Sequence, residues 1–291
     1  MTPEKAHLPD PYSHDFRDIV THVHRVRDTA RLNRVNSVEV ASLLKAGSNV
    51  VMKALGPPDT HAPTEPHQSG LRFLTQRAVV DELGRLAPPF MRLQGDGCLR
   101  ATWESHDDYI SDLLAFMFHP INYDHQYGAR LDTQGDWLIQ DDSFVEAIDR
   151  TTYHELRAIS AMPLFRLQVM LAATAARQDR FRAVIASNYR GALGPWMKLY
   201  EETFAARGFR LRPGVSLQEL ADMLAAVVEG FAIRHLGDST AEIVGDSPTG
   251  NLVGKAVLGI LNSYLVPVDA PDGPPLREEF DRRVRQLRKR R

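Results

Sequence analysis

Hydrophobic residues recur every three or four positions along most of the chain, which is the spacing of one face of an α-helix. Strand-like alternation of useful length is not found, so the sequence predicts an all-α protein. Two of the predicted helices have a clear N-terminal cap, which fixes where they begin. Ser105 precedes one apolar pattern, and Ser216 with Glu219 forms a capping box before another. The predicted helices cover residues 15–30, 71–86, 105–118, 141–177 (two or three helices), 179–206, 216–235 and 250–267.

Proline, glycine and polar runs mark the expected breaks. The segment 56–70, GPPDTHAPTEPHQSG, is predicted to be a loop. Residues 119–140 are predicted to be irregular, with DTQGDW as a turn. Pro195 lies inside the long helix 179–206, where it lacks an N–H and clashes with the preceding turn, so we expect a kink there.

Residues 37–56, SVEVASLLKAGSNVVMKALG, predict two short helices joined by a tight corner. A helix-turn-helix needs apolar residues at fixed offsets, because two short helices must lock at a fixed angle. Counted from Ser37 as the first position, the small fifth position is Ala41. The ninth position is usually glycine because the turn favours positive φ, and Lys45 at that position costs roughly 1 kcal/mol. The apolar positions four, eight, ten, fifteen and eighteen are Val40, Leu44, Ala46, Val51 and Ala54.

The charge of this region is compatible with DNA. Between Asp15 and Leu55, seven Arg or Lys residues stand against four acidic residues, whereas the whole chain has a net charge of −2. Positive charge suits phosphates, and polar residues at the start of a recognition helix suit phosphates or base edges. A helical corner with a solvated charged face is the alternative, and DNA binding is favoured over it. The candidate DNA-contacting residues are Ser37, Lys45, Ser48, Asn49, Val50 and Lys53.

With these residues the chain resembles the tetracycline-repressor (TetR) family of bacterial regulators. In 16–55, Ile19, Val20, Val23 and Val26 match the family's first-helix core, VEVASLL is similar to its second helix, and SNVVMKAL to its recognition helix. In 165–265, the phrase RGFRLRPGVSLQELADML is similar to a helix end, loop and capped helix of the family's ligand-binding and dimerisation domain. The chain departs from the family at Arg31 and Lys45, which replace glycines, and at Met52, which replaces a tyrosine.

The resemblance implies a ligand-responsive transcriptional regulator, most often a repressor, that binds a double-stranded DNA operator as a homodimer. It implies a helix-turn-helix domain over 1–70, a ligand-binding and dimerisation domain over 71–275, and a basic tail over 276–291. Helix 250–267 is apolar on nearly every face, so a second copy is expected to cover it and helix 216–236. A fully internal helix of a monomer would fit the same composition. The first alternative is a TetR-like ligand- or protein-binding module that has lost DNA reading.

The family resemblance also implies a pocket for a small hydrophobic or aromatic effector in the larger domain. Aromatic and methionine side chains near a proline-containing helix would suit such a ligand, although ordinary core packing accounts for most of them. The candidate ligand-binding residues are Trp103, Tyr109, Phe116, Met117, Phe165, Met170, Trp196 and Tyr200.

Other functions lack the residues they require. YHELR, 153–157, lacks the second histidine of a zinc-protease helix, and GDSPTGNLVGKA lacks the Lys-Ser/Thr of a phosphate loop. His119, Asp124 and His125 share one segment and could ligate a metal, but a loop role fits them better. A helical enzyme that uses the pocket is therefore a weak second alternative, and we expect no enzyme activity, metal or cofactor.

Composition places the protein in a reducing compartment. The 291 residues include one cysteine, Cys98, so no intrachain disulfide can form. Neither a secretory signal nor an apolar run of about 18–20 residues is found, so we expect a cytoplasmic protein without a membrane partner. Residues 276–291 carry eight Arg or Lys against three acidic residues. Such a tail can contact phosphates or an anionic membrane, and a solvated helical tail is the simpler interpretation.

Overall fold

Helices dominate the structure, which confirms the all-α prediction at the level of fold class. The computed structural model describes residues 5–24, 28–56, 70–93, 95, 97–122, 129–176, 178–238, 240–243 and 245–288. The chain divides into two compact units. Unit 1 comprises Met1–Gln126 and Ala161–Tyr189, and unit 2 comprises Tyr127–Ser160 and Arg190–Arg291. The expected domain boundary at residue 70 therefore lies inside unit 1.

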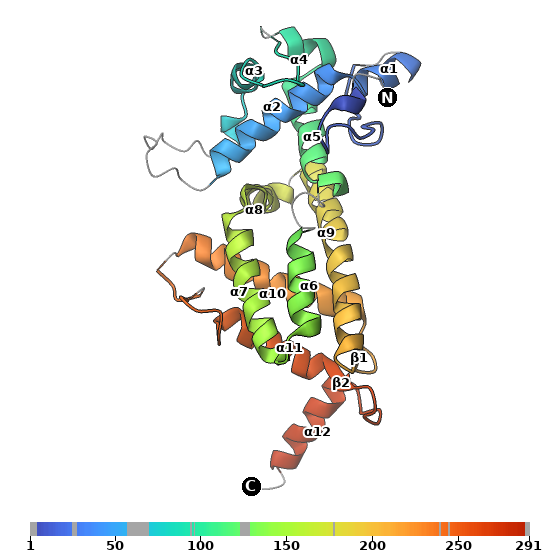
Figure 1. The fold of residues 1–291 in the computed structure, drawn as a ribbon, viewed down its shortest axis with the longest axis vertical. Helices are drawn as coiled ribbons and strands as arrows, with labels where there is room; N and C mark the ends of the chain where they lie inside the picture. The colour runs from blue at the N-terminus through green and yellow to red at the C-terminus, as the bar shows by residue number, and fades with distance from the viewer. Residues whose placement is uncertain are drawn as a thin grey trace. The chain divides into compact units, whose positions relative to one another are not determined.

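Unit 1 is built around α2 (Figure 1). Helices α3, α5 and α8 pack against α2, and their buried side chains form one hydrophobic cluster with the N-terminal segment. The elements of unit 1 are η1 (Lys5–His7), α1 (Asp28–Val35), α2 (Val38–Leu55), η2 (Gly70–Phe73), α3 (Gln76–Leu83), α4 (Gly97–Thr102), α5 (His106–Met117), η3 (Pro120–Asn122), α8 (Pro163–Ala175) and the first part of α9 (Asp179–Ala206).

The predicted corner within 37–56 is wrong, because α2 is one continuous helix of 18 residues. Ser37 caps its start by accepting a hydrogen bond from the Val40 N–H. The turn position holds Lys45, a good helix former, and Gly47 does not adopt a positive φ, so nothing in the sequence interrupts the helix there. The apolar frame that predicted two locked helices lies instead within a single helix, where Ala54 is half-buried and the other members are buried: Val40, Ala41, Leu44, Ala46 and Val51.

Gly47 allows α5 to approach α2 closely. A Cβ at this position would lie 2.6 Å from Leu113 Cδ2 and closer still to the Tyr109 hydroxyl. That hydroxyl donates a hydrogen bond to the carbonyl oxygen of Leu43, at 2.9 Å. The glycine therefore serves helix–helix packing in the middle of α2.

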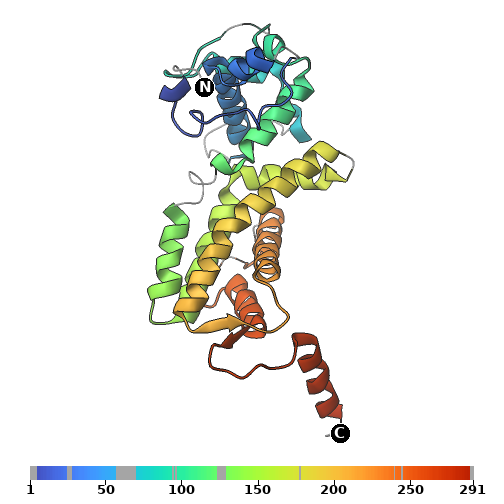
Figure 2. The same cartoon turned by 90° about the vertical axis from the view of Figure 1, so that its right-hand side faces the viewer.

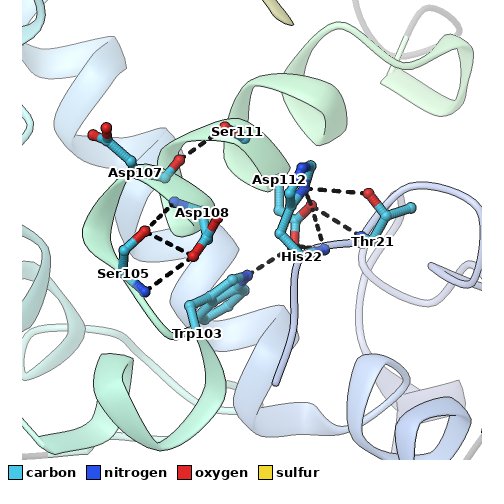
Figure 3. A network of polar contacts seen from close by, with 8 residues as sticks. All are labelled: Thr21, His22, Trp103, Ser105, Asp107, Asp108, Ser111 and Asp112. Atoms are coloured by element: carbon cyan, nitrogen blue, oxygen red, sulfur yellow. Dashed lines mark hydrogen bonds and ion pairs between the residues drawn. The ribbon is translucent and has the colours of Figure 1, made fainter. Parts of the chain in front are cut away.

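The predicted helix over 15–30 is wrong for residues 15–24, which form turns and an isolated bridge between Val23 and Trp103. Side-chain acceptors replace the helical hydrogen bonds of this segment. Figure 3 shows Asp112, which is fully buried and accepts hydrogen bonds from the Thr21 N–H at 2.9 Å and the His22 N–H at 3.0 Å. Asp112 also accepts from Trp103 Nε1 at 2.7 Å. The segment thus buries the expected apolar residues, Phe16, Ile19, Val20 and Val23, without forming a helix.

Unit 2 contains the capped helix and the apolar helix that the sequence predicts. Ser216 and Glu219 form the expected capping box at the start of α10. The elements of unit 2 are α6 (Ala129–Gln140), α7 (Phe144–Ala161, whose last residue belongs to unit 1), the rest of α9, β1 (Phe209–Leu211), α10 (Leu217–Gly237), α11 (Leu252–Tyr264), β2 (Leu265–Pro267) and α12 (Leu276–Arg288).

Two features of unit 2 differ from the prediction. The strands β1 and β2 pair antiparallel, with Arg210 opposite Val266 (Figure 2). Each strand is too short to show an alternation of hydrophobic and polar residues in the sequence. The predicted turn DTQGDW is helical, because it lies within α6. Gly135 suits that helix because a Cβ there would lie only 3.1 Å from Leu199 Cδ1 of α9. Helix α9 continues through Pro195, and the expected kink stays a prediction.

Candidate functional site

The expected DNA-contacting residues of α2 mostly make contacts within unit 1. Asn49 donates to Glu82 Oε1 at 2.9 Å, and Lys53 Nζ donates to Glu82 Oε2 at 2.5 Å. Ser48 is buried, and Val50 packs against the hydrophobic cluster. The Lys45 ammonium lies 5.6 Å from the centre of the Tyr12 ring. With Ser37 serving as the cap, these side chains do not form one outward-facing set.

Glu82 of α3 is the buried carboxylate that covers this face. Its side chain is 6% exposed, and Arg85 also lies near it, 3.7 Å from Oε2. Burial acts to raise the pKa of Glu82, but the hydrogen bonds from Lys53 and Asn49 and the two positive charges outweigh it and hold the pKa below its usual value. Glu82 is therefore ionised at neutral pH and binds the polar side chains of α2 through charge-assisted hydrogen bonds.

The eight candidate ligand-binding residues are divided between the two units. Trp103, Tyr109, Phe116 and Met117 are buried in the hydrophobic cluster of unit 1, and Met170 packs against that cluster. Phe165 is buried in α8 of the same unit. Trp196 and Tyr200 belong to unit 2, where their ring centres lie 5.7 Å apart on α9.

A second polar cluster lies inside unit 2, where α6, α7 and α9 supply its members. Glu155 of α7 is buried and binds Arg130 of α6, with Arg130 Nη2 donating to Oε1 at 3.2 Å and Nε lying 3.1 Å from Oε2. Gln134, one turn further along α6, donates its Nε2 hydrogen to Glu155 Oε2 at 3.1 Å. We use the name Glu155 cluster for Glu155, Arg130, Gln134 and Tyr200, together with Thr203, which lies on α9 between two residues that contact α6.

Electrostatics link Tyr200 to this cluster. Burial raises the pKa of Glu155, and the Arg130 charge and the Gln134 hydrogen bond oppose that rise. Burial also raises the pKa of Tyr200, and the nearby negative charge of Glu155 raises it further. Tyr200 is therefore a neutral phenol at physiological pH, next to a buried ion pair.

Two buried atoms of the Glu155 cluster have no hydrogen-bond partner among the described residues: Gln134 Oε1 and Thr203 Oγ1. Each of these residues is 1% exposed. Helices α6 and α9 meet here, since Gly135 lies against Leu199 and Arg207 Nε donates to the Leu138 carbonyl oxygen at 2.8 Å. Buried polar groups are normally paired, so two unpaired atoms at one helix interface can receive a ligand.

Sequence reasoning missed the Glu155 cluster for two reasons. Glu155 lies in YHELR, which resembles only an incomplete metal motif, and the sequence predicts an irregular segment where Arg130 and Gln134 lie. A usable signal was present in α7, because Ile148, Thr152 and Glu155 follow the helical spacing of a buried face. A carboxylate at such a position requires a buried partner.

Other candidates provide no reactive site. The loop before α11 does not have an open anion site, because Gly250 N–H donates to Asp149 Oδ2 at 2.6 Å and Asn251 Oδ1 accepts from Gly254 N–H at 2.8 Å. His22 Nδ1 lies 2.7 Å from Asp112, but this pair serves to hold the N-terminal segment. The described residues contain no group of three potential metal ligands, and Asp124 and His125 lie outside them.

Comparison with known proteins gives no match: no family model, no curated protein and no solved structure matches the chain. The likeness to the TetR family thus depends on the sequence motifs alone. No single helix of the described residues is long and apolar enough to cross a membrane.

Proposed function

We propose that the protein is a TetR-like, homodimeric, small-molecule-binding protein that does not read DNA through α2. One observation carries the choice between this function and DNA-binding regulation: Glu82 holds both Asn49 and Lys53, the two polar side chains that a recognition helix would turn towards DNA. The ligand-binding part of the proposal is supported by the Glu155 cluster, with its two unpaired buried atoms.

DNA would have to compete with a preformed anion. The Glu82 carboxylate already supplies Lys53 with negative charge and Asn49 with an acceptor, and hydrogen bonds to charged groups contribute roughly 1.5–3 kcal/mol each. A phosphate brought to α2 would also meet the charge of Glu82, which repels it. Both effects disfavour DNA at this face.

Helices α10 and α11 supply the proposed homodimer surface. Their inner residues, such as Leu224 and Val257, are buried within unit 2, whereas Met223, Ile233 and Leu252 are exposed large hydrophobic residues. Gly230 of α10 and Gly259 of α11 have open space where a Cβ would stand. Exposed apolar side chains beside helical glycines are what a closely packed helical dimer needs.

The ligand-responsive DNA-binding regulator is the second candidate function. The exposure of the Lys53 side chain, at 64%, favours it, because that ammonium can still reach a phosphate. Regulation through α2 would require α3 to move so that Glu82 releases Asn49.

Selection from a random 30-base-pair duplex library tests the two candidates. We expect no enriched sequence with the unmodified protein, and equally weak binding for the Asn49→Ala and Lys53→Ala variants. Enrichment of a sequence that Asn49→Ala abolishes would establish DNA reading by α2 and overturn the proposal.

Analytical ultracentrifugation tests the homodimer. Ile233→Glu should shift the protein from dimer to monomer, because a charge would be buried in the interface. Val145→Glu, which changes an exposed apolar residue of α7 in the same unit, is the matched control and should remain dimeric. A monomeric unmodified protein of 32.7 kDa at micromolar concentration would contradict the dimer.

A further inference from the structure

We infer that the Glu155 cluster binds an uncharged, largely aromatic molecule that carries one hydrogen-bond donor. The inference rests on the proposed ligand-binding function and adds the class of ligand and the residues that select it. It goes beyond the aromatic pocket expected from the sequence, because the polar members of the cluster decide the ligand's chemistry.

The charges of the cluster favour an uncharged ligand. The Arg130 guanidinium binds the Glu155 carboxyl group through two contacts of 3.1 and 3.2 Å, which is the geometry of an ion pair. The pair is therefore neutral as a unit and leaves no net charge for an ionic ligand to balance. Burying an additional unpaired charge beside it would be strongly unfavourable.

Glu155 also fixes the orientation of Gln134. A carboxylate accepts hydrogen bonds only, so the amide NH2 of Gln134 must face Glu155, as the 3.1 Å contact from Nε2 shows. The amide oxygen, Oε1, is thereby directed away from Glu155 and is buried without a donor. An amide oxygen in this state needs an O–H or N–H group from a ligand.

Thr203 adds a second polar contact at the same helix interface. It follows Leu199 by one turn of α9 and precedes Arg207 by one turn, and both of these residues contact α6 near Gln134. Its buried hydroxyl has no hydrogen-bond partner within the part of the chain that the structure describes, and a hydroxyl both donates and accepts. A ligand O–H group can therefore donate to Gln134 Oε1, and the Thr203 hydroxyl can donate to a ligand oxygen.

Aromatic rings on α9 supply the apolar part of the site. Trp196, Tyr200 and Phe204 are spaced four residues apart, with ring centres separated by 5.7 Å and 6.2 Å. The second pair is nearly parallel, with an interplanar angle of 14°. Flat faces in a row suit a flat aromatic ligand, which gains from offset or edge contacts.

The Thr203 hydroxyl can be tested without any ligand. Thr203→Val should raise the thermal unfolding midpoint by a few degrees, because it removes an unpaired buried polar group while keeping the side-chain shape. Thr152→Val is the matched control in the same unit and should lower the midpoint, since the Thr152 hydroxyl donates to the Ile148 carbonyl oxygen at 2.8 Å. A lower midpoint for Thr203→Val would show that its hydroxyl already has a partner, and would overturn the inference.

Titration calorimetry with three related probes tests the ligand class: 2-naphthol, 2-methoxynaphthalene and naphthalene-2-carboxylate. The rings are the same, but only the naphthol is uncharged with a donor. We expect the naphthol to bind most tightly, and Thr203→Val to weaken it about tenfold, as the loss of one hydrogen bond does. Tighter binding of the carboxylate would overturn the ligand class while leaving the proposed ligand-binding function intact. Equal binding of the naphthol and its methyl ether would overturn the role of Gln134 and Thr203, and failure of all three to bind would overturn the inference as a whole.

Discussion

Replacing Gly47 by alanine should destabilise unit 1, although alanine favours helices. The new Cβ would lie 2.6 Å and 3.1 Å from the two Leu113 methyl carbons and would collide with the Tyr109 hydroxyl. The gain in helix propensity from glycine to alanine is about 1 kcal/mol. Overpacking costs roughly 1–3 kcal/mol, and the disturbed Tyr109 hydrogen bond costs roughly 1–3 kcal/mol more. The two losses exceed the gain, so the free energy of unfolding should fall by about 1–5 kcal/mol.

Urea unfolding followed by circular dichroism measures this change. Gly97→Ala is the matched control in unit 1, because Gly97 starts α4 with no neighbour within 4 Å of the added Cβ, and it should change stability little. The Tyr109→Phe background supplies a second control. Removal of the hydroxyl makes room for the Cβ, so Gly47→Ala should cost at least about 1 kcal/mol less there. Stabilisation by Gly47→Ala, or an equal cost in both backgrounds, would refute the close approach of α2 and α5.

Three further predictions concern buried polar groups of unit 1. Burial lowers the pKa of Lys5 to about 7, with Asp15 opposing it, so the folded state binds this proton less tightly than the unfolded state. Stability should therefore rise from pH 7 to pH 9, by up to about 1.4 kcal/mol per pH unit from this residue, and urea titrations of Lys5→Met should lack that rise. The pKa of Glu82 is lowered in the folded state, so its stabilising contribution should be complete above its ordinary pKa and lost as the pH falls through the folded-state pKa. The unfolding free energies of the protein and of Glu82→Gln should therefore converge in acid. A difference between them that does not change with pH would contradict this prediction. Asp112→Leu should lower the free energy of unfolding by about 3–5 kcal/mol in denaturant unfolding. The reason is that the N–H groups of Thr21 and His22 and the Trp103 indole lose a buried charged acceptor. A decrease below about 1 kcal/mol would contradict the hydrogen-bond network around Asp112.

The sequence predicts most of the helices, because hydrophobic spacing and caps are local signals. Ser105 and Ser216 cap the helices that the sequence predicts to begin there. The failures occur where distant residues decide the local structure. Residues 15–24 have a helical pattern, but Asp112, about 90 residues away, binds their backbone N–H groups. Gly135 suggests a turn in the sequence, but in the structure its missing side chain makes room for Leu199 of α9.

The candidate site was harder to predict than the fold. The ring centres of Trp196 and Tyr200 lie 5.7 Å apart, whereas the unit 1 aromatic residues predicted with them are buried in the hydrophobic cluster. The Glu155 cluster joins residues from three helices, and no short motif contains more than one of its charged members. Glu82 could not be assigned to Asn49 and Lys53 from the sequence, because it follows them by 33 and 29 positions, respectively.

A double-mutant cycle on Asn49 and Glu82 tests the central claim, which is that Glu82 of α3 binds the polar side chains of α2 through hydrogen bonds. The unfolding free energies of the protein, Asn49→Ala, Glu82→Ala and the double variant give the coupling between the two side chains. We predict a coupling of roughly 1–2 kcal/mol, as expected for a hydrogen bond to a buried carboxylate. The same cycle on Lys45 and Glu82 is the control and should give a coupling near zero, since Lys45 lies over Tyr12. Zero coupling between Asn49 and Glu82 would contradict the claim and leave α2 open to DNA.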